Sequence, residues 1–264
     1  MTKQTYGLAL WWGWAKWYAH IWAIQYIEKH NIVIDEISGS SMWAIIGAMY
    51  ASGISPQLMK HIFSELSYAK LFDGSIDVGV FGGKKLTKWL ESVFGDAQIQ
   101  DCKIPLKIVA CDIETGDKIV FEKWSIVQAL RASVAFPGLI SPAEIDDKLL
   151  VDGGIVDNLP IDLLENNRII AVSVVDTLYE KIETNQSFRW FTIPDSSFTK
   201  TQRVITNSIN IMLQRIEDLT IQSYDKELIL IRPDMSKYTM FDMKKLEEIV
   251  TFGYEQTALV LEKL

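Results

Sequence analysis

Short apolar segments rich in β-branched residues alternate with helix-like segments along most of the chain. The strand-like segments are expected at 5–10, 33–39, 105–113, 117–122, 148–154 and 168–176. Apolar residues recur at helical spacing in 16–30, 42–52, 84–94 and 125–133, and a long helix near 201–222 and a terminal helix from Met243 flank a last strand, ELILIRP. This order predicts an α/β fold of three layers, α/β/α, with a mainly parallel central sheet that helices cover on both faces.

The composition of the 264-residue chain narrows its possible functions. No Pro-, Gly- or Ser-rich linker divides it, so we expect a single domain over residues 1–264. The net charge is −8, with acidic and basic residues interspersed, which argues against a nucleic-acid partner and against strong attraction to anionic lipid. Cys102 and Cys111 are too few for a disulfide framework or a structural zinc site, and the N-terminus lacks the pattern of an export signal. We therefore expect a cytoplasmic protein.

Residues 8–22 contain five of the nine tryptophans of the chain. The surrounding segment, 8–27, is apolar enough to raise the alternative of a membrane span, which needs about 20 such residues. Lys16 and His20 fall near its middle, where a charge is costly, and tryptophan is typical of the ends of a span. A span is therefore disfavoured, although a non-catalytic interfacial or membrane segment remains as an alternative.

The segment DEISGSSMWAIIGA places Ser41 between an expected strand and an expected helix. A turn at such a junction lifts the hydroxyl above the sheet, and the N–H groups of the following helix point toward any oxyanion that forms there. Gly39 and Ser41 match the pattern G-x-S-x-G, but Trp43 stands where the last glycine is expected. Ser41 is accordingly a candidate nucleophile, with a helix-capping serine as the alternative.

A serine nucleophile needs a base, and the histidines limit the choice. No histidine follows His61, so the order Ser, Asp, His of the α/β-hydrolases is impossible. His20 and His30 lie on the helix after the first strand, where packing or capping is the better interpretation. The segment LLVDGGIVDNLP offers Asp152 at a strand end, followed by two glycines that permit a close backbone approach. Asp152 is the carboxylate candidate, and an aspartate that caps its own turn is the alternative.

Three segments together resemble the short bacterial patatin-like phospholipases, in order and with matching separations, over residues 6 to about 176. They are 7–53 around Ser41, 104–142, and LVDGGIVDNLP. The resemblance implies a patatin-like fold with a Ser41/Asp152 dyad and an oxyanion loop of the form G-G-G-x-K-G at residues 12–17. The backbone donors of this loop would be Trp12, Gly13 and Trp14, with motif support from Lys16, Trp17, Gly39, Trp43, Gly153 and Gly154.

Tryptophan occupies seven positions at which the family pattern has glycine. They are Trp11, Trp12, Trp14, Trp17, Trp22, Trp43 and Trp124. The two residues share neither size nor backbone preference, whereas UGA is read as tryptophan in some genetic codes and as glycine in others. We therefore expect an alternative genetic code, with glycine at all seven positions of the natural chain. Glycines would let the loop amides turn toward one point, which tryptophans could do only at a cost of ~1–2 kcal/mol per residue.

The resemblance implies a serine acyl hydrolase that cleaves lipid or phospholipid esters, as a phospholipase A or lysophospholipase does, without a metal or other cofactor. The apolar loop after residue 70 and the variable C-terminal part, 177–264, are expected to form the acyl groove or to touch a membrane surface, which would be the inner surface for a cytoplasmic protein. A catalytically dead lipid-binding protein is the alternative if the tryptophans are genuine. Head-group preference and oligomeric state stay open.

The remaining polar residues near these motifs are interpreted as structural. They are Asp112, Glu114, Arg131 and Ser133. Cys111 is expected to be a small buried apolar residue, since no histidine is near it in sequence. A dinucleotide-binding loop at 11–17 is disfavoured, because Asp35 and Glu36 precede the serine turn and do not stand alone at the end of the second strand.

Overall fold

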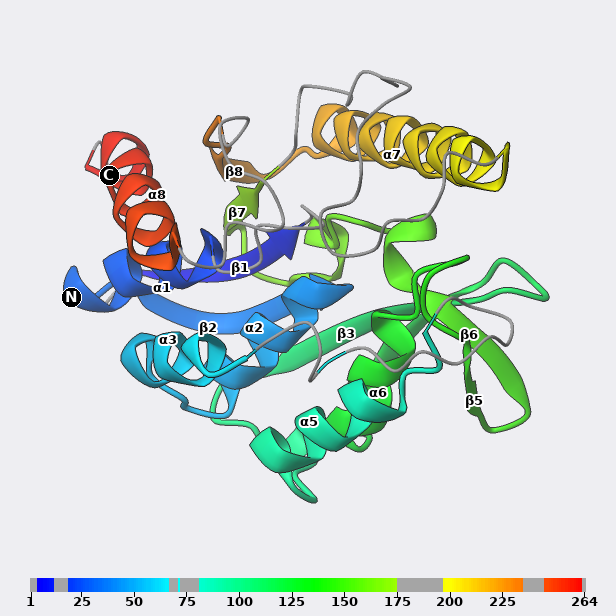
Figure 1. Cartoon of the computed structure of the whole chain (residues 1–264). Coiled ribbons are helices and arrows are strands. Elements are labelled where there is room, and N and C mark those ends of the chain that lie inside the picture. Colours follow the sequence, from blue (N-terminus) through cyan, green and yellow to red (C-terminus); the bar gives the residue numbers. More distant parts are fainter. Residues whose placement is uncertain are drawn as a thin grey trace.

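The computed structural model describes residues 4–11, 19–66, 71, 81–174, 197–234 and 245–262. Within these residues, eight strands form one sheet (Figure 1). The strands are β1 (Thr5–Trp11), β2 (Val33–Ser40), β3 (Leu106–Asp112), β4 (Lys118–Phe121), β5 (Ala143–Ile145), β6 (Lys148–Asp152), β7 (Arg168–Ser173) and β8 (Glu227–Ile231). The helices are α1 (Ala19–Lys29), α2 (Met42–Ala51), α3 (Pro56–Ser64), α5 (Lys84–Phe94), α6 (Ile126–Ser133), α7 (Ser197–Ser223) and α8 (Leu246–Leu261). Three 3₁₀ turns are η1 (Ile99–Asp101), η2 (Gly153–Ile155) and η3 (Ile161–Leu163).

The strand order is β5-β6-β3-β2-β1-β7-β8, and β4 pairs with β3. β3, β2, β1, β7 and β8 pair in parallel, whereas β4, β5 and β6 join in antiparallel orientation. The prediction of an α/β fold with a mainly parallel sheet is therefore confirmed. The three-residue strand β5 was not predicted, because so short a segment carries no readable periodicity.

The two faces of the sheet can be followed along β2, whose side chains alternate between them. Ile37 faces α2, since its Cγ2 lies 3.2 Å from where a Cβ on Gly47 would stand. Ser38 faces the other side, where its hydroxyl donates to the carbonyl of Pro160 at 2.8 Å. Pro160 belongs to the segment 153–167, which leaves β6 and crosses behind β2 to reach β7. The crossing segment and α2 therefore cover opposite faces.

Helix α7 lies over the crossing segment, toward the edge of the sheet that β8 forms (yellow in Figure 1). The side-chain amide of Asn158 donates to the carbonyl of Leu213, in the middle of α7, at 2.5 Å. Both residues are buried, with exposed fractions of 0% for Asn158 and 2% for Leu213. This contact joins α7 to the loop that follows Asp152.

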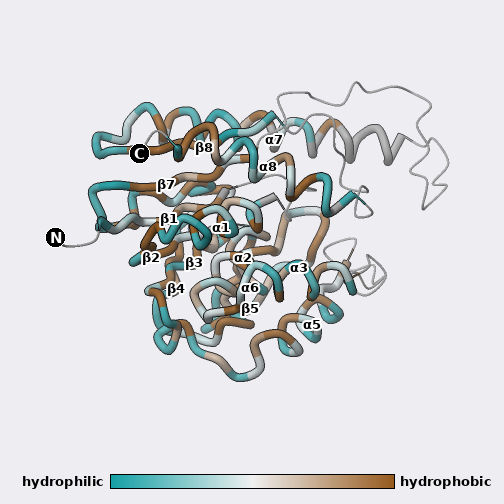
Figure 2. Tube along the Cα trace, turned by 90° about the vertical axis from the view of Figure 1, so that its left-hand side faces the viewer, coloured by the Kyte–Doolittle hydropathy of each residue, from teal (hydrophilic) through white to brown (hydrophobic). Residues whose placement is uncertain are grey.

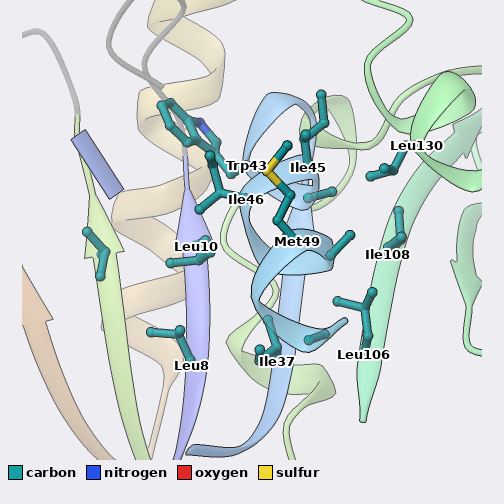
Figure 3. Close-up of a cluster of buried hydrophobic side chains, with 14 of the residues drawn as sticks. Leu8, Leu10, Ile37, Trp43, Ile45, Ile46, Met49, Leu106, Ile108 and Leu130 are labelled. Carbon is teal, nitrogen blue, oxygen red and sulfur yellow. The ribbon is translucent and has the colours of Figure 1, made fainter. Parts of the chain in front are cut away.

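The apolar core lies between the sheet and α2 (Figure 3). Leu8 and Leu10 from β1, Ile37 from β2, and Leu106 and Ile108 from β3 meet α2 there. Most of α2 is buried, as expected for a helix that is apolar on all sides. Along the strands the tube in Figure 2 is mostly brown, with hydrophilic colours on the outer turns. This packing holds the amino end of α2 firmly above β2.

Local signals mark several helix ends in the part of the chain that the structure describes. Ser55 caps α3 by accepting the N–H of Leu58 at 3.3 Å, and Gly53 and Gly95 end α2 and α5 with positive φ values of 86° and 54°. Helix α8 begins at Leu246, three residues after the predicted Met243, which lies outside the described residues. In the described part of the chain, no helix is both long and apolar enough to cross a membrane.

Candidate active site

The pairing of β3 explains how two strand ends that are distant in sequence meet. Residues 108–109 of β3 pair with both β2 and β4, and residues 110–111 pair with both β4 and β6. Because a strand has only two edges, β2 and β6 share the edge opposite β4. β2 runs parallel to β3 and β6 runs antiparallel, so their carboxyl ends meet, with Ser40 opposite Val109 and Asp152 opposite Ala110. The residue after β2 therefore lies beside Asp152.

Ser41 is that residue, and it stands in a sharp turn between β2 and α2. Its backbone has φ 60° and ψ −145°, a region that residues other than glycine rarely occupy. Its N–H donates to the hydroxyl of Ser133 at 2.8 Å, and its own hydroxyl donates to Oδ2 of Asp152 at 2.5 Å. The two residues that the sequence motifs single out are thus joined by a direct hydrogen bond.

Asp152 is held in a fixed orientation below the serine. Its exposed fraction is 1%, its Oδ1 accepts the N–H of Gly154 at 2.8 Å, and its own N–H donates to the carbonyl of Ala135 at 3.0 Å. Burial raises the pKa of the carboxyl to about 7, against the lowering effect of its hydrogen bonds from Ser41 and Gly154. Asp152 can therefore exchange a proton near neutral pH.

Two motif glycines lie where a side chain would collide with backbone. A Cβ on Gly153 would stand 2.2 Å from the carbonyl oxygen of Val109, and a Cβ on Gly39 would stand 3.0 Å from Cα of Ala44. The first distance excludes any side chain, so Gly153 allows β6 to end against β3. The second shows how closely the amino end of α2 approaches β2. Both contacts set the position of the Ser41/Asp152 pair.

The histidines take packing roles, as expected from the sequence. His20 is fully buried, and its Nε2 lies 3.1 Å from the carbonyl oxygen of Val172. Its ring stacks on the indole of Trp43, with 3.9 Å between the centroids. The ring of His30 stacks on Tyr26 at 4.0 Å. The described contact of the Ser41 hydroxyl is with Asp152, not with an imidazole.

The predicted oxyanion loop falls outside the described residues. This applies to Trp12, Gly13, Trp14, Lys16 and Trp17, whereas the backbone of Trp11 ends β1 opposite Ser173. Since β1 lies next to β2 in the sheet, the loop leaves from the same end as the Ser41 turn.

The three other tryptophans at family glycine positions differ in how they pack. Trp124 is partly exposed, and its Nε1 donates to Gln128 at 2.8 Å. Trp43 is buried against His20 at the carboxyl end of β1 (Figure 3). Trp22 is fully buried with no hydrogen bond to its Nε1, and a Cβ on Gly253 would stand 2.1 Å from its ring. Of these three, Trp22 has the poorest fit, because its buried N–H is unpaired and its ring crowds Gly253.

The polar residues that were expected to be structural divide into two groups. Asp112 accepts the N–H of Glu114 at 3.1 Å, and Arg131 donates to the carbonyl of Ser141 at 2.7 Å, so these contacts stabilise loops. Ser133 instead holds the N–H of Ser41, a role that its sequence context did not reveal. Cys111 is buried, which raises the pKa of its thiol, as expected for an unreactive cysteine.

We predict that the backbone of Ser41 is strained and that glycine relieves the strain. Both Ser41→Gly and Ser41→Ala remove the hydroxyl, but only glycine accepts φ 60° with ψ −145°, so Ser41→Gly should be more stable by about 1 kcal/mol in urea unfolding. Ser52 at the other end of α2 is a matched control, because its φ is −74°. There the order should reverse, with alanine more stable than glycine. An alanine variant at position 41 that is as stable as the glycine variant contradicts the strain.

Comparisons with known proteins agree on one family. The family model described as patatin-like phospholipase matches residues 13–165. An uncharacterized NTE family protein of Mycobacterium tuberculosis is 36% identical over 157 residues, which are 58% of this chain and 44% of that protein. The lysophospholipase NTE1 of Candida albicans is 25% identical over 96% of this chain and 20% of its own length. The chain thus spans less than half the length of these curated relatives.

The fold is also found in a solved structure. VipD from Legionella pneumophila superposes with a TM-score of 0.63 at 15% sequence identity, over 98% of this chain and 67% of that chain. At this identity the likeness concerns the fold alone.

Proposed function

Because this chain belongs to the patatin-like phospholipase family, we propose that it is a serine hydrolase that cleaves carboxylic esters of lipids, with Ser41 as the nucleophile and Asp152 as the base. The observation that carries the proposal is the hydrogen bond of 2.5 Å from the Ser41 hydroxyl to a buried carboxylate. The name of the Candida albicans relative, a lysophospholipase, supports a lipid ester as the substrate class.

The reaction proceeds in two steps. Asp152 accepts the Ser41 proton while Oγ attacks the ester carbonyl, and the resulting oxyanion collapses to an acyl-enzyme when the leaving alcohol takes that proton. A water molecule then attacks the acyl group as Asp152 accepts its proton. Release of the fatty acid returns the proton to Ser41, so the dyad ends as it began.

Burial makes Asp152 suited to this work. An ordinary aspartate, with a pKa of about 3.9, is a weak base toward a serine hydroxyl. Desolvation raises the pKa of Asp152 to about 7, which brings proton acceptance closer to balance at neutral pH. The hydrogen bond from Gly154 keeps Oδ1 occupied, so Oδ2 is the oxygen that acts on Ser41.

The oxyanion needs donors other than the N–H of Ser41, because that group already donates to Ser133. We assign this role to the backbone of Trp12, Gly13 and Trp14, at the end of the sheet where β1 and β2 stop side by side. A preorganised donor of this kind contributes about 10²–10³-fold to the rate. Lys16 then holds the loop in place.

Glycine at the seven tryptophan positions belongs to the same proposal. Trp22 supports it, since an indole with an unpaired N–H pressed against Gly253 is a costly arrangement between α1 and α8. The variant with all seven positions changed to glycine is called the glycine chain below. It restores both the G-x-S-x-G pattern at Ser41 and the loop pattern at 12–17.

Labelling with a fluorophosphonate probe tests the proposed dyad. In the glycine chain we expect Ser41 to be labelled at a rate that rises with pH and levels off above about 7, because Asp152 accepts a proton only in its ionised form. The Ser41→Ala variant should show no labelling. Labelling that persists in this variant, or a rate that does not change between about pH 5 and 8, contradicts the dyad.

A further inference from the structure

One side of α7 carries large apolar side chains in solvent. They are Val204, Ile211, Met212 and Leu219, with exposed fractions of 52%, 49%, 56% and 51%. At about 100° per residue these positions fall within an arc of roughly 100°, so they form one row along the helix. In the described part of the chain the other large apolar side chains of similar exposure stand singly, on α3, after β3 and on α8. A concentration of this kind on one helix is typical of an interaction surface.

The opposite side of α7 is anchored beside the dyad. The carbonyl of Leu213 accepts the amide of Asn158, and its Cδ2 lies 4.0 Å from where a Cβ on Gly154 would stand. Gly154 in turn donates its N–H to Asp152. One turn further along, the fully buried Glu217 forms an ion pair of 2.6 Å with Arg232, which follows β8. The apolar row is therefore fixed to the same end of the sheet as Ser41.

We propose that this row docks on the surface of a lipid bilayer and brings the site to its substrate. The inference rests on the proposed function, because a lipid ester that is embedded in a bilayer reaches Ser41 only if the protein meets that surface. Arg215 is exposed in the middle of the same arc, and its long side chain suits phosphate groups at the level of the lipid head groups. The net charge of −8 favours a zwitterionic surface over a strongly anionic one.

Binding to phosphatidylcholine vesicles tests the proposal in the glycine chain. The double variant Ile211→Ser, Met212→Ser should lower the vesicle partition coefficient about tenfold, because two half-exposed apolar side chains no longer enter the interface. The matched control is Leu58→Ser, Leu259→Ser, which removes two side chains of similar exposure, 48% and 60%, from α3 and α8. We expect the control to bind within twofold of the parent chain.

Two substrates separate this inference from the proposed function. Hydrolysis of a short, water-soluble ester should be unchanged in the α7 double variant, whereas hydrolysis of phospholipid in vesicles should fall by the same factor as binding. Equal vesicle binding by the two double variants, or no binding by the parent chain, overturns the docking surface. Self-association that is lost in the α7 variant while vesicle binding persists overturns it too, in favour of a second copy of the chain. Failure of the soluble ester to react counts against the proposed function alone, since binding is measured without turnover.

Discussion

Replacement of Asp152 by asparagine in the glycine chain should lower kcat/KM for a soluble ester by about 10⁴-fold or more, because the amide cannot accept the Ser41 proton. The same variant should be more stable than its parent. The pKa of Asp152 is raised to about 7 in the folded chain, so between about pH 4 and 7 the folded state holds a proton that the unfolded state has lost. Stability therefore falls as the pH rises through this window, and asparagine removes that loss.

Unfolding in urea at about pH 5 and pH 8 measures this effect, which we expect to reach about 1–3 kcal/mol at the higher pH. Asp157→Asn is the matched control on the same loop. Asp157 is also buried, with its pKa raised to about 6, but its carboxylate pairs with Lys118 at 2.9 Å. The pKa of Asp157 is raised less than that of Asp152, so its replacement should stabilise the chain at pH 8 by less than Asp152→Asn does, and it should leave turnover within a few-fold of the parent. If the probe labels the Asp152→Asn variant at the same rate as the parent chain, Asp152 is not the base.

If the Asp152→Asn variant is more stable than its parent, Asp152 is a residue that the chain keeps for its chemistry and not for its stability. Its burial and the backbone of Ser41 at φ 60° both oppose folding, and both come from the close meeting of β2 and β6. The core between α2 and the sheet offsets these costs. The site is therefore strained because the surrounding packing fixes it, and the fixed geometry is what lets a hydroxyl and a carboxylate share one proton.

Local sequence patterns were sufficient to predict those elements whose signals lie within the element itself. Helix α5 runs over Lys84–Phe94 as predicted, because an amphipathic repeat is followed by Gly95 at positive φ. The candidate residues Ser41 and Asp152 were also found locally, since each stands at a strand end, Ser41 two residues after Gly39 and Asp152 directly before Gly153. In these cases the physics that shapes the element acts between near neighbours in sequence.

The arrangement of the site could not be derived in the same way. Ser133 accepts a hydrogen bond from the N–H of Ser41, which is 92 residues away in sequence, and no feature of the segment LRASVAFPG marks that contact. The apolar pattern of β6 predicts a strand but not its direction, although only the antiparallel direction brings Asp152 to the end of β2. The contact between Asn158 and α7 likewise depends on the crossing of a whole segment behind the sheet.

Restoring glycine at the seven tryptophan positions should raise probe labelling and ester hydrolysis by at least about 10²–10³-fold. The chain that keeps the tryptophans should be insoluble or inactive. The reason lies at the amino end of α2. The indole of Trp43 stacks on His20 at 3.9 Å and so occupies the space between α2 and the start of α1. The proposed oxyanion loop lies in the stretch between β1 and α1, and we infer that its amides need this space to reach an oxyanion on Ser41.

Expression of the chain with tryptophan, of the glycine chain and of three single variants separates the causes. Trp43→Gly should recover part of the labelling, while Trp124→Gly should recover none, because Trp124 is partly exposed and hydrogen-bonded to Gln128. Trp89→Gly is the control at a tryptophan outside these seven positions, and it should only destabilise the chain, since its ring packs on Phe63 with 5.9 Å between centroids. A folded tryptophan chain that turns over ester as fast as the glycine chain would show that the indoles do not obstruct the site. A glycine chain that folds, binds vesicles and stays unlabelled would instead leave the lipid-binding protein without catalysis as the function, because the oxyanion loop would then be open and Ser41 still inert.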